Sequence, residues 1–146
     1  MQTIIIRDAN YSDRDGILAI DEIAQCEQER IDFIDRVLDS ATCLVADSNG
    51  TVIAYGVLEY SFFGNGFVSM LYVAKSARRR GVGRSLMRAL ANQCKVSKLF
   101  TSTNESNSAM RALLATLGYV PSGVIENLDP DDPELVFFLN LNRRGY

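Results

Sequence analysis

The stretch that most constrains the fold of this chain is residues 73–88, where an apolar segment leads into a basic turn and then a helix. Residues 67–73 form an apolar run that is typical of a buried strand. Three consecutive arginines follow at residues 78–80, and then come Gly81 and Gly83. The next apolar residues recur at helical spacing and form one stripe: Val82, Leu86, Ala89 and Leu90. The sequence therefore predicts a strand, a basic glycine-containing turn and a helix N-terminus.

This order of elements predicts an anion-binding site at the start of the helix. The first backbone N–H groups of a helix have no partner within it, and the helix dipole favours negative charge there. Glycine lets the backbone approach a phosphate closely. A Walker A loop is excluded because its Gly-Lys-Ser/Thr ending is absent, and a dinucleotide fingerprint would need a glycine where Leu86 stands. An ordinary strand-to-helix turn with solvated arginines remains the alternative.

The distribution of charge supports a local site for a polyphosphate ligand. The 146 residues carry a net charge of −3, yet residues 60–104 contain eight basic residues and no acidic one. The rest of the chain contains seven basic and 18 acidic residues. A nucleic-acid-binding protein is usually basic overall, so we expect no nucleic-acid partner. Nucleic-acid binding through the arginine run stays an alternative, and its affinity would fall steeply with salt.

Length and composition predict one cytoplasmic domain over residues 1–146. No apolar run approaches the roughly 18 residues of a membrane span, and the N-terminus does not have the pattern of a signal peptide. Cys26, Cys43 and Cys94 fit neither a zinc spacing nor a disulfide framework, so we expect no metal and reduced, mostly buried thiols. Histidine is absent, which removes the commonest general base and metal ligand.

Hydrophobic periodicity and turn signals predict the element order β-α-α-β-β-β-α-β-α-β-β. A helix capped by Ser12 and containing Ile17 and Ile23 follows the first strand. The expected strands are residues 3–8, 42–46, 52–63, 67–73, 97–103, 119–125 and 134–141, and the later helices include residues 28–38 and 105–117. This order predicts an α+β fold with a mixed, mostly antiparallel sheet of about seven strands and about four helices.

Two segments together resemble the motifs of the GCN5-related N-acetyltransferases, the GNAT superfamily. Residues 78–83, Arg-Arg-Arg-Gly-Val-Gly, resemble its Arg/Gln-x-x-Gly-x-Gly/Ala pyrophosphate loop. Residues 107–119, which begin with Asn107 and end in Gly118-Tyr119, resemble its later Asn-x-x-Ala-x-x-Leu-Tyr-x-x-x-Gly-Phe motif. The motifs occur in the family's order and at its usual separation, and the element order is also that of the GNAT fold. The resemblance implies an acyltransferase that uses acetyl-CoA as co-substrate.

The resemblance also implies which residues hold the coenzyme. The backbone of the strand before the turn would hydrogen-bond the pantetheine arm, and this strand would splay from the strand at residues 97–103. The turn would wrap the pyrophosphate, chiefly through backbone N–H groups. Asn107 would contact the coenzyme with its side-chain amide, or would simply cap the helix. The implied cofactor-binding residues are Leu71, Tyr72, Val73, Arg78, Arg79, Arg80, Gly81, Val82, Gly83, Arg84 and Asn107.

Leu114 departs from the family pattern, because many members have there a tyrosine that protonates the departing thiolate. Leucine cannot donate a proton, so we expect a tyrosine hydroxyl (Tyr72, Tyr60 or Tyr119) or a water to take this role. Otherwise Leu114 packs in the core. General acid help is worth about 10²–10⁴-fold, and its loss slows transfer without abolishing it. For the base that deprotonates the amine, Glu59 is the first candidate and Glu126 the second. The alternative for each of them is a solvated surface carboxylate without a catalytic role.

Residues 126–134 predict the acceptor, because five carboxylates fall in this segment with no basic residue among them. In the family, this segment flanks the acceptor side of the coenzyme slot. Two prolines restrict its backbone. Carboxylates here, with Glu126 and Asp129 as the candidate substrate-binding residues, would attract a cationic amine. The alternative is an acidic, solvated turn that improves solubility.

The resemblance therefore implies an N-acetyltransferase that moves an acetyl group to a primary amine of a small molecule or peptide. The amine would attack the thioester directly in a ternary complex. The alternative, suggested by Leu114, is a non-catalytic sensor that binds CoA or acetyl-CoA. We expect a monomer or homodimer without a membrane partner.

Overall fold

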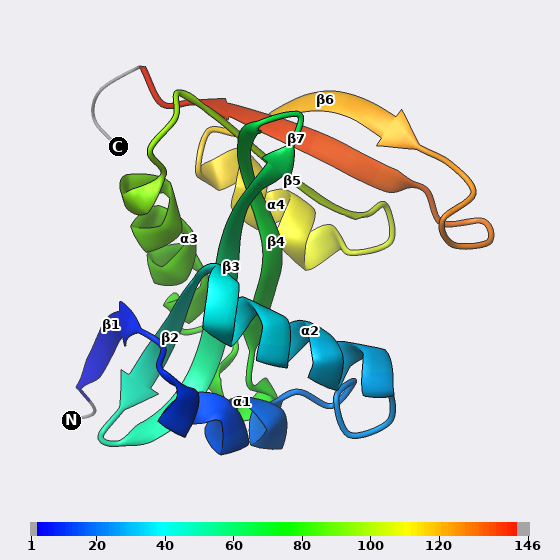
Figure 1. The fold of residues 1–146 in the computed structure, drawn as a ribbon. Helices are drawn as coiled ribbons and strands as arrows, with labels where there is room; N and C mark the ends of the chain where they lie inside the picture. The colour runs from blue at the N-terminus through cyan, green and yellow to red at the C-terminus, as the bar shows by residue number, and fades with distance from the viewer. Residues whose placement is uncertain (1–2, 143–146) are drawn as a thin grey trace. The chain divides into compact units, whose positions relative to one another are not determined.

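The computed structural model describes residues 3–142, which form a mixed β-sheet and four α-helices (Figure 1). The strands are β1 (Ile4–Asp8), β2 (Thr42–Ser48), β3 (Thr51–Phe62), β4 (Asn65–Val73), β5 (Lys98–Asn104), β6 (Val120–Ile125) and β7 (Glu134–Asn140). The helices are α1 (Arg14–Ile20), α2 (Gln28–Ser40), α3 (Val82–Gln93) and α4 (Ser108–Thr116), with 3-10 turns at Tyr11–Asp13 and Lys75–Ala77. The predicted α+β class and element order are confirmed.

The sheet has the strand order β1-β2-β3-β4-β5-β7-β6. β1 with β2, β2 with β3, β5 with β7 and β6 with β7 pair in antiparallel fashion. β4 and β5 pair in parallel, and the chain between them forms α3, as a parallel connection requires. The sheet is therefore mixed and mostly antiparallel, as the sequence predicts. Among residues 3–142, no helix is long and apolar enough to cross a membrane.

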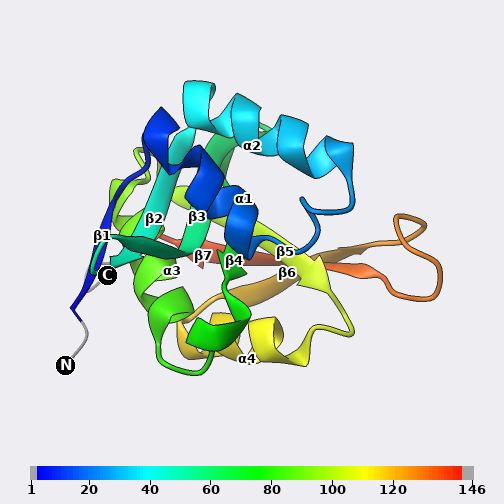
Figure 2. The same cartoon turned by 90° about the horizontal axis from the view of Figure 1, so that it is seen from below.

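The chain divides into two compact units, and the first comprises Met1–Leu58 with Met70–Leu90. In this unit α1 and α2 cover one face of β2 and β3 (Figure 2). Ile17, Ile34 and Val37 from the helices pack there with Val45 and Val57 from the strands. Ile34 and Val37, three positions apart on α2, and the alternate residues Tyr55 and Val57 of β3 thus share one core, as the two periodicities require.

Helix α3 covers the opposite face of β3 in the same unit (Figure 2). Gly56 follows Tyr55 on β3, so it points away from the α1–α2 side. A Cβ atom on Gly56 would lie 2.8 Å from Cδ1 of Leu90. The absence of a side chain at Gly56 therefore lets the apolar stripe of α3, with buried Leu86 and Leu90, pack closely on the strand.

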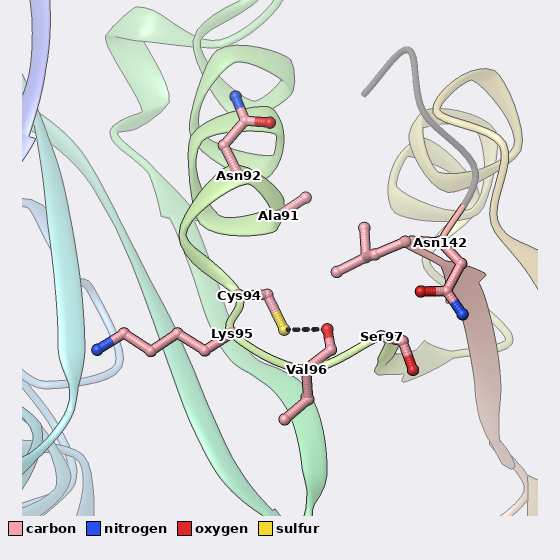
Figure 3. Close-up of a pocket in the computed structure, with 8 residues that line it drawn as sticks. Ala91, Asn92, Cys94, Lys95, Val96, Ser97 and Asn142 are labelled. Carbon is pink, nitrogen blue, oxygen red and sulfur yellow. Dashed lines mark hydrogen bonds between the residues drawn. The ribbon is translucent and has the colours of Figure 1, made fainter.

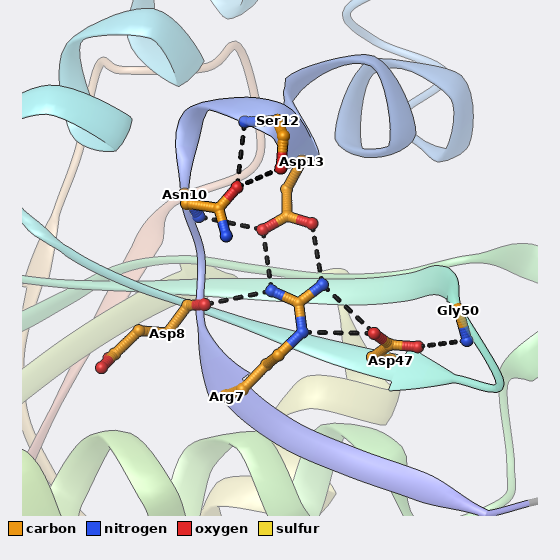
Figure 4. Close-up of polar contacts among 7 residues, drawn as sticks. All are labelled: Arg7, Asp8, Asn10, Ser12, Asp13, Asp47 and Gly50. Carbon is orange, nitrogen blue, oxygen red and sulfur yellow. Dashed lines mark hydrogen bonds and ion pairs between the residues drawn. The ribbon is translucent and has the colours of Figure 1, made fainter.

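Arg7 on β1 organises a polar cluster in the first unit (Figure 4). Its Nη1 and Nη2 donate hydrogen bonds of 2.8 Å to the two carboxylate oxygens of Asp13, and its Nε lies 3.2 Å from Oδ2 of Asp47. Asp47 also accepts a 2.7 Å hydrogen bond from the N–H of Gly50 in the β2–β3 turn. This cluster ties the start of α1 and the β2–β3 hairpin to the first strand.

The second unit comprises Glu59–Ser69 with Ala91–Tyr146, and its described part ends at Asn142. Leu114 of α4 and its C-cap residue Leu117 are buried, as are Leu99, Thr101 and Thr103, which alternate along β5. The residues between them on β5 belong to the other face, where an aromatic row crosses the strands with ring centroids 5.0–5.1 Å apart: Phe62, Phe67, Phe100 and Phe138. The alternation follows from the twofold period of a strand.

The predicted start of the first helix is wrong, and the capping residue lies two positions earlier than predicted. Asn10, and not Ser12, caps the chain, because its side chain accepts a 3.0 Å hydrogen bond from the N–H of Ser12. The residues it caps form the 3-10 turn, and α1 begins at Arg14. Ile23 lies beyond the end of α1 at Ile20. The predicted helix was too long at its C-terminal end, because Ile23 continues the helical spacing of hydrophobic residues into the following connection.

Candidate functional site

The predicted anion loop lies in the first unit, between the end of β4 and the start of α3. Arg79 and Gly81 have φ angles of +64° and +79°, so the backbone turns twice through the left-handed region. An arginine adopts this conformation at a cost, and such strain is concentrated at functional sites. The first backbone hydrogen bond into α3 runs from the N–H of Ser85 to the carbonyl of Gly81, over 3.1 Å. The earlier N–H groups of the helix, from Val82 onward, precede this ladder and are available to an anion.

The side chain of Arg78 is held at the entrance to the loop. Its Nε donates a 3.0 Å hydrogen bond to the carbonyl of Val73, and its guanidinium lies 5.7 Å from the centroid of the Tyr72 ring. The first unit thus brings together three of the predicted coenzyme residues, Tyr72, Val73 and Arg78. The side chains of Arg79, Arg80 and Arg84 are exposed, and Val82 is buried under the loop.

The strand that would bind the pantetheine arm extends past its ladder with β5. The register pairs of the two strands join residues 66–68 of β4 to residues 99–101 of β5. β4 continues to Val73, so the predicted residues Leu71, Tyr72 and Val73 lie beyond these pairs. The N–H of Ala74 donates a 2.8 Å hydrogen bond to the carbonyl of Ile53, which ties the end of β4 to β3.

Asn107 caps α4 in the second unit. Its Oδ1 accepts a 3.0 Å hydrogen bond from the N–H of Met110. Helix α4 therefore begins at Ser108, three residues later than the sequence predicts. The cap uses only the amide oxygen of Asn107. The side chain is exposed, and its Nδ2 group can act as a donor at the same time.

Within the second unit, the acidic loop between β6 and β7 is hydrogen-bonded to the turn before α4. Asp132 accepts hydrogen bonds from the N–H and the hydroxyl of Ser106, over 3.0 and 2.6 Å. Asp129 accepts a 2.9 Å hydrogen bond from Nδ2 of Asn104, and the N–H of Glu105 donates to the carbonyl of Pro133. Sequence reasoning missed Asn104 and Ser106, because their partners lie more than 20 positions away. Two of the predicted loop carboxylates thus position the loop.

The remaining candidate carboxylates differ in their surroundings. Glu126, which directly follows β6, and Asp131 are both exposed, and Asp131 has a φ of +58°. Glu59 on β3 is half-buried, and its Oε2 accepts a 2.5 Å hydrogen bond from the hydroxyl of Ser69 on β4. Glu59 and Ser69 both belong to the second unit, whereas Tyr72 belongs to the first.

Leu114 has no exposed surface in α4. Its backbone carbonyl accepts a 3.0 Å hydrogen bond from the N–H of Tyr119, which closes the helix end across Gly118, where φ is +91°. Leu114, which the motif resemblance aligns with the family's tyrosine, is thus a core residue.

A cavity of about 440 Å³ opens at the other end of α3 (Figure 3). Ala91, Asn92 and Cys94 line it, together with Leu141 and Asn142, which follow β7. The Sγ atom of Cys94 lies 3.5 Å from the carbonyl of Val96. All the residues that line the cavity belong to the second unit, whereas the anion loop belongs to the first.

The cysteines are less buried than the sequence predicts. Only Cys43 is buried, whereas Cys94 is half-buried and Cys26 is exposed. The exposure of Cys26 follows from its place in the α1–α2 connection, where the expected helix has ended. All three are free thiols, and within residues 3–142 no three potential metal-ligating side chains converge.

Comparison with known proteins decides the family. Residues 8–119 match the Acetyltransferase (GNAT) family. This chain belongs to the GNAT acetyltransferase family. No curated protein shows a significant sequence match to it. A GNAT-family acetyltransferase from Bacillus cereus has 30% identity and a TM-score of 0.89, and the match covers 97% of this chain and 99% of that one.

More distant GNAT structures share the fold. The yncA protein from Salmonella typhimurium, whose structure contains its cofactor acetyl-CoA, has 18% identity and a TM-score of 0.77 over 98% of this chain and 96% of that one. A ribosomal-protein-alanine N-acetyltransferase from Brucella melitensis has 24% identity and a TM-score of 0.77 over 94% and 99%. The GNAT assignment predicted from the two motifs is therefore confirmed.

Proposed function

We propose that this GNAT protein transfers the acetyl group of acetyl-CoA to a primary amine of a small molecule or peptide. The observation that carries the proposal is the loop at residues 78–84, whose two left-handed residues lead into the N-terminus of α3 beside four exposed arginines. Backbone N–H groups and guanidinium groups at such a position suit a diphosphate. The relative with 30% identity and the acetyl-CoA bound by the yncA protein support this choice of co-substrate.

The proposed reaction is a direct attack within a ternary complex. The amine nitrogen forms a bond to the thioester carbonyl carbon, the carbon–sulfur bond breaks, and the thiolate of CoA leaves. The attacking nitrogen gives up one proton to a base, and the thiolate takes up one proton. Positioning the amine against the thioester supplies the largest part of the acceleration.

Glu59 and Tyr72 are the proposed proton carriers. The carboxylate of Glu59 accepts a hydrogen bond from the hydroxyl of Ser69, and we assign this carboxylate as the acceptor of the amine proton. The hydroxyl of Tyr72 accepts a 3.2 Å hydrogen bond from the N–H of Glu22, which leaves its own hydrogen to be donated to the thiolate. Leu114 is buried and has no hydroxyl, so it takes no part in proton transfer.

We propose further that the acceptor is cationic and meets the acidic loop. Asp129 and Asp132 hold the loop in place, and the exposed carboxylates of Glu126 and Asp131 extend from it. Exposed carboxylates attract an amine by electrostatics that weaken as salt is added. The proposed contact residues are therefore Glu126 and Asp131, with Asp129 oriented by Asn104 as a further partner.

The acceptor proposal is tested by neutralising the exposed pair, Glu126→Gln with Asp131→Asn. The acceptor KM should rise about tenfold at low salt and depend less on salt, while the KM for acetyl-CoA stays constant. The matched control removes two exposed carboxylates of the first unit, Asp15→Asn with Asp39→Asn, and should leave both constants unchanged. An acceptor KM that is equal in all three proteins would exclude the loop from recognition.

The transfer activity itself is tested by release of free CoA thiol from acetyl-CoA in the presence of amines, polyamines, amino acids and peptides. An acetyltransferase releases thiol only when a suitable amine is present. The alternative, a sensor that binds CoA and does not catalyse, is consistent with the absence of a hydroxyl at Leu114. Binding of acetyl-CoA without thiol release across the whole panel would favour the sensor.

A further inference from the structure

Tyr72 on β4 joins the coenzyme loop to the connection between α1 and α2, in contacts that all lie in the first unit. On one side, the guanidinium of Arg78 lies 5.7 Å from the centre of its ring. The Tyr55 ring is stacked with it at a centroid distance of 6.3 Å and an interplanar angle of 25°. At the tip of the ring, the hydroxyl accepts the 3.2 Å hydrogen bond from the N–H of Glu22.

The connection that Tyr72 contacts is built around the fully buried carboxylate of Asp21. Its Oδ1 accepts hydrogen bonds from the N–H groups of Ile23 and Ala24, over 3.0 and 3.2 Å. Its Oδ2 accepts 2.6 Å hydrogen bonds from Nη1 of Arg30 and from the hydroxyl of Tyr55. A buried carboxylate is tolerated only when it is satisfied in this way. The hydrogen bonds of Asp21 therefore hold the connection in one conformation.

Tyr55 is a permanent donor to this carboxylate. Burial raises the pKa of Tyr55 far above its ordinary value, and the hydrogen bond to Asp21 raises it further. The tyrosine is therefore neutral at physiological pH, so its ring offers a fixed platform to Tyr72. A continuous series of contacts thus leads from Asp21 through the two rings to Arg78.

We propose that Tyr72 is a positioning residue that couples occupation of the coenzyme loop to the order of the α1–α2 connection at residues 21–27. The inference rests on the proposed binding of CoA to the loop. A diphosphate that binds the guanidinium of Arg78 restricts it to the position over Tyr72. The restricted ring then keeps its hydroxyl at the N–H of Glu22. By linkage, a ligand that favours this arrangement stabilises the hydrogen bond, and the hydrogen bond favours the ligand.

The coupling requires the hydroxyl of Tyr72, so Tyr72→Phe isolates it. This change keeps the ring against Arg78 and Tyr55 but removes the acceptor for the N–H of Glu22. Tyr60→Phe is a matched control, because the hydroxyl of Tyr60 also accepts a main-chain hydrogen bond, over 3.1 Å from the N–H of Lys95 in the second unit. Both changes remove one oxygen atom from a strand tyrosine.

The experiment is amide hydrogen exchange of each protein with and without CoA, at a concentration ten times the dissociation constant of that protein. In the original protein and in Tyr60→Phe, CoA should slow exchange at Glu22 by about fivefold or more. In Tyr72→Phe, CoA should protect the loop around residues 79–84 but leave exchange at Glu22 unchanged. Thermal unfolding of both variants checks that each is folded.

Two results would overturn the inference. Protection of the loop without protection of Glu22 in the original protein would exclude the coupling and leave coenzyme binding intact. Equal protection of Glu22 in Tyr72→Phe would show that the coupling does not use the tyrosine. If CoA protects neither segment of the original protein, the proposed function fails as well, so the two failures are distinguishable.

Discussion

The hydroxyl of Tyr55 donates a 2.6 Å hydrogen bond to the carboxylate of Asp21, which has no exposed surface. The bond joins β3 to the connection between α1 and α2 across 34 positions of sequence. Arg30 supplies the opposite charge to the same oxygen at 2.6 Å. The buried carboxylate of Asp21 thus determines the conformation of the connection between α1 and α2.

Tyr55→Phe should destabilise the fold by about 1–3 kcal/mol, because it leaves a buried carboxylate with one donor fewer and preserves the shape of the ring. Urea unfolding measures the change. Tyr60→Phe, which removes a hydroxyl that accepts an exposed main-chain bond, should cost less. Equal costs for the two changes would contradict the special role of the Asp21 cluster.

The Arg7 cluster predicts a loss of stability in acid. The hydrogen bond from Arg7 lowers the pKa of Asp13 below its ordinary value, against the opposing effect of burial. A carboxyl group whose pKa is lower in the folded state stabilises the fold above its unfolded pKa, which is about 4. This contribution is lost as the pH falls from about 4 through the folded pKa.

Arg7→Met tests the acid prediction, because Asp13 then loses the partner that lowers its pKa. The variant should be less stable at pH 7 by about 2 kcal/mol and should lose less stability between about pH 5 and 2. Urea midpoints across this pH range give both quantities. An acid limb as steep as that of the original protein would show that other carboxylates determine it.

The three cysteines should react at very different rates with a thiol reagent. Burial raises the pKa of Cys43 to about 12, so its thiol is protonated at pH 8 as well as inaccessible. Exposed Cys26 should react first and half-buried Cys94 more slowly. Cys43 should react only after unfolding. Rapid titration of all three thiols in the folded protein would contradict this order.

Leu114→Tyr should lower stability by about 1–3 kcal/mol, because the added ring atoms exceed the space around a fully buried side chain. Leu113→Tyr, at the half-buried neighbouring position, should cost less. Thermal unfolding and thiol release are measured on both variants. Unchanged stability together with faster thiol release in Leu114→Tyr would show instead that the position is still an acid site.

The sequence predicts the elements of this fold well because each has a local cause. The stripe formed by Leu86 and Leu90 marks α3, and the turn signal at Gly50 marks the β2–β3 hairpin. The basic loop was also predictable, since its three arginines and two glycines fall within six consecutive residues. The backbone conformation of the loop was harder to predict, because Arg79 has a positive φ, which arginine rarely adopts.

The parts that could not be predicted depend on distant partners. Asp21 reads as one more polar residue of a helix, and only the fold brings Tyr55 and Arg30 to it. The sequence identifies Asp132 only as one carboxylate of the acidic loop, and only the fold places Ser106 against it. Sequence pattern identifies such residues as polar but does not show whether they meet solvent, substrate or another part of the chain.

The most direct test of the coenzyme loop is the dissociation constant of acetyl-CoA measured by calorimetry for Gly83→Asp. An aspartate suits the first turn of a helix, so the fold should remain intact while its carboxylate blocks the backbone and repels phosphate. Asn92→Asp, with the same charge change in the last turn of α3, is the control. The account predicts a loss of at least about tenfold in affinity for Gly83→Asp and none for the control. Equal affinity in the two folded variants and the original protein would contradict the central claim.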